Sequence, residues 1–173
     1  MNGEIINRVA SSNLVQIDME DWYDHLQRRQ FDLAEYLFKG LILKELDFRA
    51  ALKLIDWTAY SNCHLAICCS ADAIIPTWAF MLPATYASPY ASSIIWGTVD
   101  QIDTILFDRW IEKLDIEKYR DQKVIVKGCS KFPVPISAYV AITAKLSSVV
   151  QSLMFGEPCS NVPLFKRKKE NLI

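Results

Sequence analysis

The fold is decided by the stretch at residues 63–97, CHLAICCSADAIIPTWAFMLPATYASPYASSIIWG. Residues 63–69 form an apolar run of buried-strand length, and residues 92–97 have the pattern of a second short strand. Between these two segments, Pro76 suits the first turn of a helix that extends to about residue 87. This order of strand, helix and strand predicts a βαβ unit with two parallel strands.

Similar patterns flank this unit on both sides. Residues 14–19 alternate between apolar and polar as a half-buried strand does, and residues 123–127, Lys-Val-Ile-Val-Lys, predict a third core strand. Helices are expected at residues 32–38, at 44–56, after the capping box of Thr98 and Gln101, and from Pro135 to a stop at Gly156 and Pro158. We therefore predict an α/β fold with a mainly parallel sheet of βαβ units, in which strand 63–69 lies between strands 92–97 and 123–127.

The chain length favours a single domain. A chain of 173 residues suits one domain of ordinary size, and we find no internal repeat at the domain scale and no linker rich in Pro, Gly or Ser. We expect residues 1–60 to form an N-terminal strand and helices, residues 61–156 the βαβ core, and residues 157–173 an extended C-terminal segment with a basic tail.

The composition excludes several classes of protein. A hydrophobic content of 51% with 23% charged residues is that of a globular chain with a substantial core. A net charge of −1 gives no electrostatic reason to expect nucleic acid as a partner. The N-terminus has no basic segment followed by an apolar one, and prolines interrupt the uncharged residues 73–99, so we expect a cytoplasmic protein without a membrane partner.

Three segments of similar sequence contain the candidate site. Cys-Ser pairs begin at Cys69, Cys129 and Cys159, and each has a proline a few residues away. Five cysteines without an export signal argue against a disulfide framework. Thiolates are ligands of zinc and of iron–sulfur clusters, and three of them leave one position for a further ligand or a substrate. We therefore predict a metal site of Cys69, Cys129 and Cys159, holding zinc or an iron–sulfur cluster.

The predicted topology supports two of these three ligands. Cys69 and Cys129 follow strands that are expected to flank the switch point of the sheet, where open α/β sheets bind ligands. The long helix predicted from Pro135 would carry the chain about 30 Å away before it reaches Cys159. We therefore expect Cys159 to join the site from the same chain or from the twofold mate of a homodimer.

Two carboxylates are candidate additional ligands or acid/base groups. Asp72 is the only Asp, Glu, Lys or Arg between Asp56 and Asp100, and it lies three residues after Cys69. A carboxylate stabilised by the dipole at the N-terminus of a helix is the simpler explanation of Asp72, ahead of a role as fourth ligand or acid/base group. Glu157 is the weaker candidate, because an exposed turn also explains it.

Two other functions stay open. One is a thiol enzyme or sulfur carrier that uses a single cysteine, such as Cys129 beside the start of a helix, where a thiolate is stabilised. The other is a non-catalytic interaction module in which the cysteines only pack, as we expect for Cys63 and Cys68. The distances between the sulfur atoms would distinguish these functions from a metal site.

Four stretches resemble a bacterial family, domain of unknown function 2480 (DUF2480). They are LILKELDFR at 41–49, CSADAIIPTWA at 69–79, KGCS at 127–130 and MFGEPCS at 154–160. The resemblance spans nearly the whole chain, and the Cys-Ser segments are its most specific parts. Genes of such proteins often lie near those for iron–sulfur assembly proteins, so the resemblance implies these proteins as partners and a role in cluster or sulfur handling.

Overall fold

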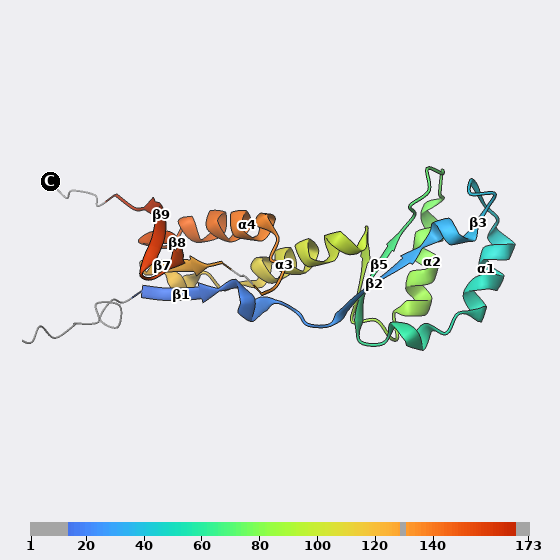
Figure 1. Cartoon of the computed structure of the whole chain (residues 1–173), viewed down its shortest axis with the longest axis horizontal. Helices are drawn as coiled ribbons and strands as arrows, with labels where there is room; N and C mark the ends of the chain where they lie inside the picture. Colours follow the sequence, from blue (N-terminus) through green and yellow to red (C-terminus); the bar gives the residue numbers. More distant parts are fainter. Residues whose placement is uncertain (1–13, 129–130, 169–173) are drawn as a thin grey trace, which may run out of the picture. The chain divides into compact units, whose positions relative to one another are not determined.

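The computed structural model describes residues 14–128 and 131–168 and forms two compact units. Unit 2 is the continuous segment Asp24–Ile102, and unit 1 combines Met1–Tyr23 with Asp103–Ile173. Each unit contains its own sheet (Figure 1). Each also has its own cluster of buried hydrophobic side chains. The predicted mixed α/β fold with largely parallel sheets is confirmed. That the whole chain forms one domain stays a prediction.

Unit 2 is built around a three-stranded parallel sheet in the order β2-β5-β6. Its main elements are β2 (Gln27–Asp32), α1 (Glu45–Leu54), β5 (Cys63–Cys68), α2 (Thr77–Ala87) and β6 (Ser93–Trp96). Short elements lie between them: 3-10 helices at Leu33–Tyr36, Trp57–Tyr60 and Val99–Gln101, and the two-stranded pair β3 (Leu37–Phe38) and β4 (Ile42–Leu43). The βαβ unit predicted from residues 63–97 is therefore confirmed, because β5 and β6 are parallel neighbours connected through α2.

Unit 1 has three parallel strands and one antiparallel strand, in the order β1-β7-β8-β9. Its elements are β1 (Leu14–Asp18), α3 (Ile102–Lys113), β7 (Lys123–Lys127), α4 (Ile136–Ser147), β8 (Ser152–Glu157) and β9 (Ser160–Lys166). Short 3-10 helices follow β1 at Met19–Trp22 and precede β7 at Glu117–Tyr119. The first strand of the unit is separated from the rest by all of unit 2.

The two units are an internal repeat, which the sequence alone did not reveal to us. In unit 2, His64 of β5 pairs with Ser93 of β6; in unit 1, Lys123 of β7 pairs with Ser152 of β8, a shift of 59 residues in both strands. The first strands match as well, because β2 and β1 are the parallel neighbours of β5 and β7. Both units therefore follow the plan β-α-β-α-β with one strand order, and the expectation that the chain contains no repeat was wrong.

Unusual backbone positions recur with the same shift. Asn62 and Asp121 have φ angles of 54° and 56°, one and two residues before the middle strand of their units. Gly97 and Gly156 have φ angles of 142° and 117° at the end of the third strand, a region that favours glycine. The units therefore share turn geometry as well as strand order.

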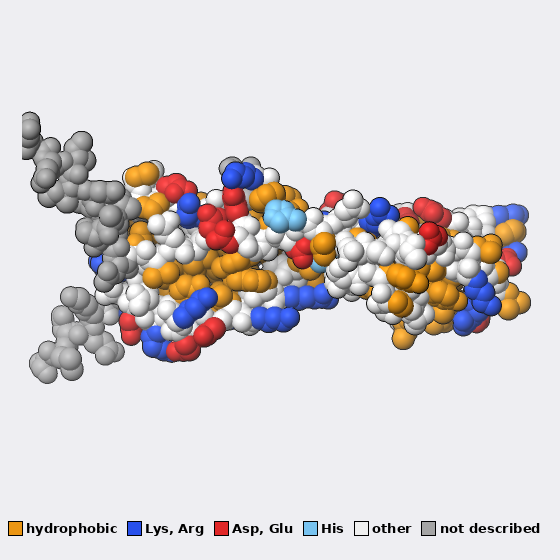
Figure 2. All heavy atoms as spheres, turned by 90° about the horizontal axis from the view of Figure 1, so that it is seen from below, with side chains coloured by type: hydrophobic (Ala, Val, Ile, Leu, Met, Phe, Trp, Pro, Cys, Tyr) orange, Lys and Arg blue, Asp and Glu red, His pale blue; other side chains and the backbone are white. Residues whose placement is uncertain are grey.

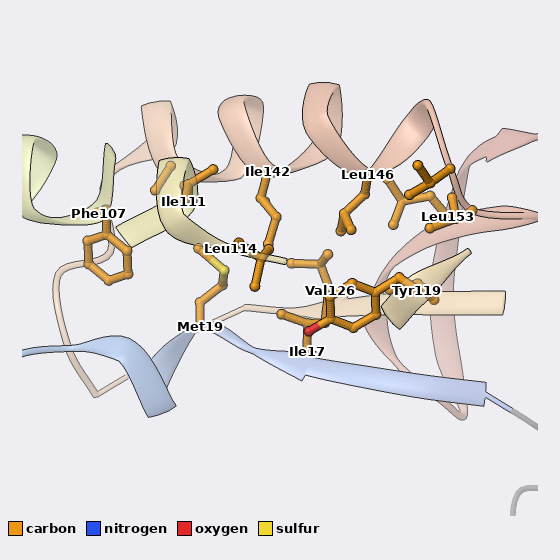
Figure 3. Close-up of a cluster of buried hydrophobic side chains, with 14 residues drawn as sticks. Ile17, Met19, Phe107, Ile111, Leu114, Tyr119, Val126, Ile142, Leu146 and Leu153 are labelled. Carbon is orange, nitrogen blue, oxygen red and sulfur yellow. The ribbon is translucent and has the colours of Figure 1, made fainter. Parts of the chain in front are cut away.

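The two cores are built from matching helix positions. The buried face of α2 consists of Ala79, Pro83 and Ala87, and that of α4 of Ala138, Ile142 and Leu146, at i, i+4 and i+8 in both helices. Figure 3 shows the side chains of α4 pointing toward those of β7 and β1 in unit 1. Full burial of one Leu or Ile side chain contributes about 1.5–3 kcal/mol, so Ile142 and Leu146 stabilise the packing of α4, whereas the stripe of α2 consists of smaller side chains.

The predicted order of the core strands was wrong in one respect. Strand 123–127 lies in the sheet of unit 1, so it does not flank strand 63–69. The other neighbour of β5 is β2, which we did not predict because its sequence, Gln-Arg-Arg-Gln-Phe-Asp, is almost entirely polar. Such a sequence is compatible with a strand at the edge of a sheet, where one side of the strand faces solvent.

The predicted long helix from Pro135 is also corrected. α4 ends at Ser147, and the hydroxyl groups of Ser147 and Ser148 donate hydrogen bonds to the carbonyls of Thr143 and Lys145. The chain then forms β8, so residues 152–157 are a strand, and Gly156 and Pro158 belong to the region where β8 turns into β9.

The helix predicted at residues 32–38 is only a short 3-10 turn followed by β3. Asp32 does cap this turn, as the sequence indicated, because its carboxylate accepts a hydrogen bond from the amide of Ala34. No helix within the described residues is long and apolar enough to cross a membrane.

Candidate functional site at the carboxyl ends of the strands

Cys69 lies at the carboxyl end of the unit 2 sheet, directly after β5. Its side chain is half-buried against the hydrophobic cluster of the unit, and its Sγ atom lies 3.7 Å from the carbonyl oxygen of Ala71. The amide of Ser70 donates a 3.0 Å hydrogen bond to Oδ1 of Asp32 at the end of β2. The Cys69 loop is therefore attached to the neighbouring strand by its backbone.

Asp32 accepts hydrogen bonds from two backbone amides, those of Ser70 and Ala34. Partial burial opposes ionisation of this carboxyl group, but the hydrogen bonds from Ser70 and Ala34 outweigh it and lower the pKa of Asp32 below its ordinary value. The ionised carboxylate of Asp32 therefore holds the Cys69 loop in place through its hydrogen bond with Ser70. Asp72, further along the same loop, has an exposed side chain.

The carboxyl end of the unit 1 sheet is charged. Lys127 Nζ, at the end of β7, lies 3.4 Å from Asp18 Oδ2 and 3.5 Å from Glu157 Oε1. The hydrogen bond with Asp18 and the negative charge of Glu157 raise the pKa of Lys127. The three charges come from the ends of β1, β7 and β8, so they mark the edge at which parallel sheets commonly bind ligands. Glu157, a candidate ligand, is engaged in this ion pair.

Cys159 is exposed in the turn between β8 and β9. Gly156 shapes the approach to this turn, because a Cβ atom there would lie 2.7 Å from the carbonyl oxygen of Ser160. Asn161 Nδ2 donates a 3.4 Å hydrogen bond to the carbonyl of Pro158 across the turn. The thiol of Cys159 is therefore presented to solvent by a hairpin with defined geometry.

The predicted metal ligands are distributed over both units. Cys69 belongs to unit 2 and Cys159 to unit 1, while Cys129 lies outside the described residues. Within residues 14–128 and 131–168, no three His, Cys, Asp or Glu side chains are grouped so that they could hold a metal ion. A single site of all three cysteines stays a prediction.

The repeat explains why two of the three Cys-Ser segments look alike. Cys69 follows the middle strand of unit 2, and Cys129 follows the middle strand of unit 1 in sequence. Pro76 and Pro135 then precede α2 and α4 at the constant shift of 59 residues. Part of the similarity is therefore structural, because both segments connect a strand to the next helix.

A second pair of sites matches between the units and was missed from the sequence. Each unit has an apolar groove beside its third strand, and the two have similar volumes, about 530 and 540 Å³. The α2 groove is lined by Ile67, Thr77, Phe80, Met81, Ala84, Ile94, Ile95 and Trp96. The α4 groove is lined by Val126, Tyr139, Val140, Thr143, Ala144, Phe155 and Leu164. Exposed hydrophobic side chains form patches on the surface seen in Figure 2.

Unit 2 also contains a buried histidine, His64. His64 Nδ1 lies 2.7 Å from Ser93 Oγ, and Nε2 lies 3.1 Å from Asp24 Oδ2 without an aligned hydrogen bond. Partial burial opposes ionisation of Asp24, but the amide of Leu26 and the charge of His64 outweigh it and lower the pKa of Asp24. His64 and Ser93 lie at the amino ends of β5 and β6, opposite to the edge where α/β sheets bind ligands, so we assign them a structural role.

Comparison with known proteins agrees with the resemblance seen in the sequence. No curated protein and no solved structure matches the chain. A family model described as "Protein of unknown function (DUF2480)" matches residues 3–167, almost the full length. The chain therefore belongs to the DUF2480 family.

Proposed function

We propose that this cytoplasmic protein binds a thiophilic metal ion, zinc or the iron of an iron–sulfur cluster, through its Cys-Ser segments. The observation that carries the proposal is the exposed thiol of Cys159, held in a hairpin at the carboxyl end of a parallel sheet. Iron–sulfur assembly proteins would then be its partners. Cysteine thiolates are the ligands that zinc and iron–sulfur clusters prefer.

Chain order supports a pair of ligands in unit 1. β7 and β8 are parallel neighbours, and a cysteine is the second residue after the end of each strand: Cys129 after Lys127, and Cys159 after Glu157. We propose that Cys129 and Cys159 are the primary ligands. Cys69 is the third candidate, because it occupies the matching loop of unit 2.

The remaining cysteines are poor ligands. Cys63 and Cys68 are buried within β5, and burial raises the pKa of both thiols. Cys63 Sγ also lies 3.1 Å from the carbonyl oxygen of Tyr60, to which it donates a hydrogen bond. A thiol with a raised pKa is seldom present as the thiolate that binds metal, so these two residues serve as controls.

Metal and sulfide analysis of protein purified without oxygen tests the proposal. We expect stoichiometric metal in the wild type and a loss of about tenfold or more in Cys129→Ser and Cys159→Ser. Cys63→Ala should keep the wild-type metal content. Wild-type protein that carries no stoichiometric metal after anaerobic purification and reconstitution with zinc or with iron and sulfide would refute the proposal.

A second candidate function is that of an interaction module, and the α2 groove favours it. Trp96 is 76% exposed and Met81 63% exposed, although both line an apolar groove. Exposed apolar surface of this kind usually marks a site of protein contact. Binding of a second protein chain at this groove, measured by the loss of Trp96 exposure, would support this function.

A further inference from the structure

β6 is an edge strand without the usual protection against pairing. It is the last strand of its sheet, and no described strand pairs with its outer side. Residues 91–97, Ala-Ser-Ser-Ile-Ile-Trp-Gly, contain neither a charged residue nor proline. Charges, prolines and bulges are the devices by which edge strands avoid pairing with other chains, so β6 is open to the addition of a strand.

The backbone groups of β6 that face outward can be identified from its bonds to β5. The amide of Ser92 donates a 2.9 Å hydrogen bond to the carbonyl of Cys63. Because alternate residues of a strand point their backbone groups to opposite sides, the N–H and C=O groups of Ser93 and Ile95 point away from β5. These groups form the row that an added strand would bond.

Unit 1 shows what covers the matching edge there. β8, the counterpart of β6, pairs with the antiparallel strand β9, in which Val162 lies opposite Phe155. Leu164 of β9 also lines the α4 groove. Phe155 is 37% exposed, whereas its counterpart Trp96 is 76% exposed. The same edge is thus covered by an antiparallel strand in unit 1 and uncovered in unit 2, and the strand that covers it contributes Leu164 to the wall of the α4 groove.

We propose that β6 pairs antiparallel with β6 of a second copy of this chain, which joins two three-stranded sheets into one of six strands. In the register centred on Ile95, the two Ile95 residues exchange both backbone hydrogen bonds. Ile94 then lies opposite Trp96 of the second copy, on the face that carries the α2 groove.

The second copy fits because this edge is complementary to itself. It supplies both the groove and the aromatic side chain that covers the groove of the partner, as the isologous interface of a twofold dimer requires. The interface does not depend on the proposed metal site, since none of its residues is a cysteine.

Sedimentation velocity over a range of protein concentrations tests the proposal. The wild type should be dimeric, and Trp96→Lys should weaken the dimer by about tenfold or more in Kd, because it places a charge in an apolar interface. Met81→Lys should have the same effect from the other side of the groove. Leu54→Lys is the matched control, because Leu54 is 88% exposed on α1 of the same unit and does not line the groove. Circular dichroism confirms that each variant folds.

Amide hydrogen exchange of residues 93–97 provides a second measurement, since their exchange should slow as the dimer forms. A wild-type protein that is monomeric up to about 100 µM overturns the proposal. A dimer that Trp96→Lys and Met81→Lys leave intact, or that Leu54→Lys weakens equally, also overturns it. The dimer should persist in Cys159→Ser with chelator present, and a dimer lost under those conditions would be a metal-linked assembly instead.

Discussion

Units 1 and 2 share the same order of strands and helices but differ in two regions, the carboxyl ends of the strands and the outer edge of the third strand. At the carboxyl ends of the strands, unit 1 gathers the charges of Asp18, Lys127 and Glu157, whereas unit 2 uses Asp32 to bind the backbone of the Cys69 loop. At the third strand, unit 1 has β9 and unit 2 has an open edge. The comparison indicates that buried positions preserve the plan of the repeat while loops and edges acquire separate roles.

The largest effect is expected from matched core residues. Leu33 of unit 2 and Met19 of unit 1 follow the first strand of their units, and both are fully buried. Replacing either by Ala should lower the free energy of unfolding by about 2–5 kcal/mol, because a cavity remains. Amide hydrogen exchange should accelerate mainly in β5 for Leu33→Ala and mainly in β7 for Met19→Ala. Equal acceleration in both strands for both variants would show that the units unfold together.

The matched glycines should respond unequally. A Cβ atom at Gly156 would lie 2.7 Å from the backbone oxygen of Ser160, whereas at Gly97 the close contact is the movable end of the Gln101 side chain. Both positions have positive φ angles, which cost about 1–3 kcal/mol for other residues. Chemical denaturation should therefore show a greater loss of stability for Gly156→Ala than for Gly97→Ala, and the reverse order would contradict the geometry of the hairpin.

His64 and Lys123 occupy matching positions at the start of the middle strand, but only His64 is buried. His64→Ala removes a buried ring that contacts Ser93 and Asp24, and should cost about 1–3 kcal/mol. Lys123→Ala should change the unfolding free energy by at most about 0.5 kcal/mol, as exposed positions usually do. Urea denaturation of both variants at neutral pH measures the difference. An equal loss of unfolding free energy in the two variants would contradict the structural role assigned to His64.

A modest effect is expected at the capping aspartates. Asp32→Ala and Asp18→Ala should each lose about 1 kcal/mol, with the greater loss for Asp32 because Ser70 also donates to it. The pKa of Asp32 is lower in the folded state than its unfolded value of 3.8. The contribution of Asp32 to the free energy of unfolding is therefore complete above pH 3.8 and is lost as the pH falls through the lower pKa of the folded state. The stability difference between wild type and Asp32→Ala should therefore shrink below pH 3.8, and a difference that is constant down to acid unfolding would contradict the cause given for the shift.

The sequence predicted those parts of the fold in which local pattern and tertiary environment agree. The apolar run of β5, the proline before α2 and the alternation in β1 were each sufficient to identify their elements. β2 was missed because an edge strand does not require apolar residues on both faces, and the helix predicted from Pro135 was too long because Ser147 and Ser148 end it.

The candidate site was less accessible to prediction than the fold. The Cys-Ser segments could be recognised in the sequence. Placing Cys69 and Cys129 at the edge of one sheet required β5 and β7 to be neighbours, but these strands belong to different sheets. The repeat itself was hidden, because unit 2 separates the first strand of unit 1 from its other elements and the matched positions differ in residue type, as His64 and Lys123 do. Each groove is lined by side chains of a helix and of strands that lie apart in the sequence, and only the folded unit brings them together.

The insertion of unit 2 into unit 1 also determines the order in which the chain can fold as it is synthesised. All strands of unit 2 lie within the continuous segment Asp24–Ile102, so this unit can form as soon as that segment leaves the ribosome. β1 must wait for its partner β7, which begins at Lys123. At about 5–20 residues per second, the delay is on the order of 5–20 seconds. During that time the apolar side chains of β1, those of Leu14, Val15 and Ile17, have no sheet to join.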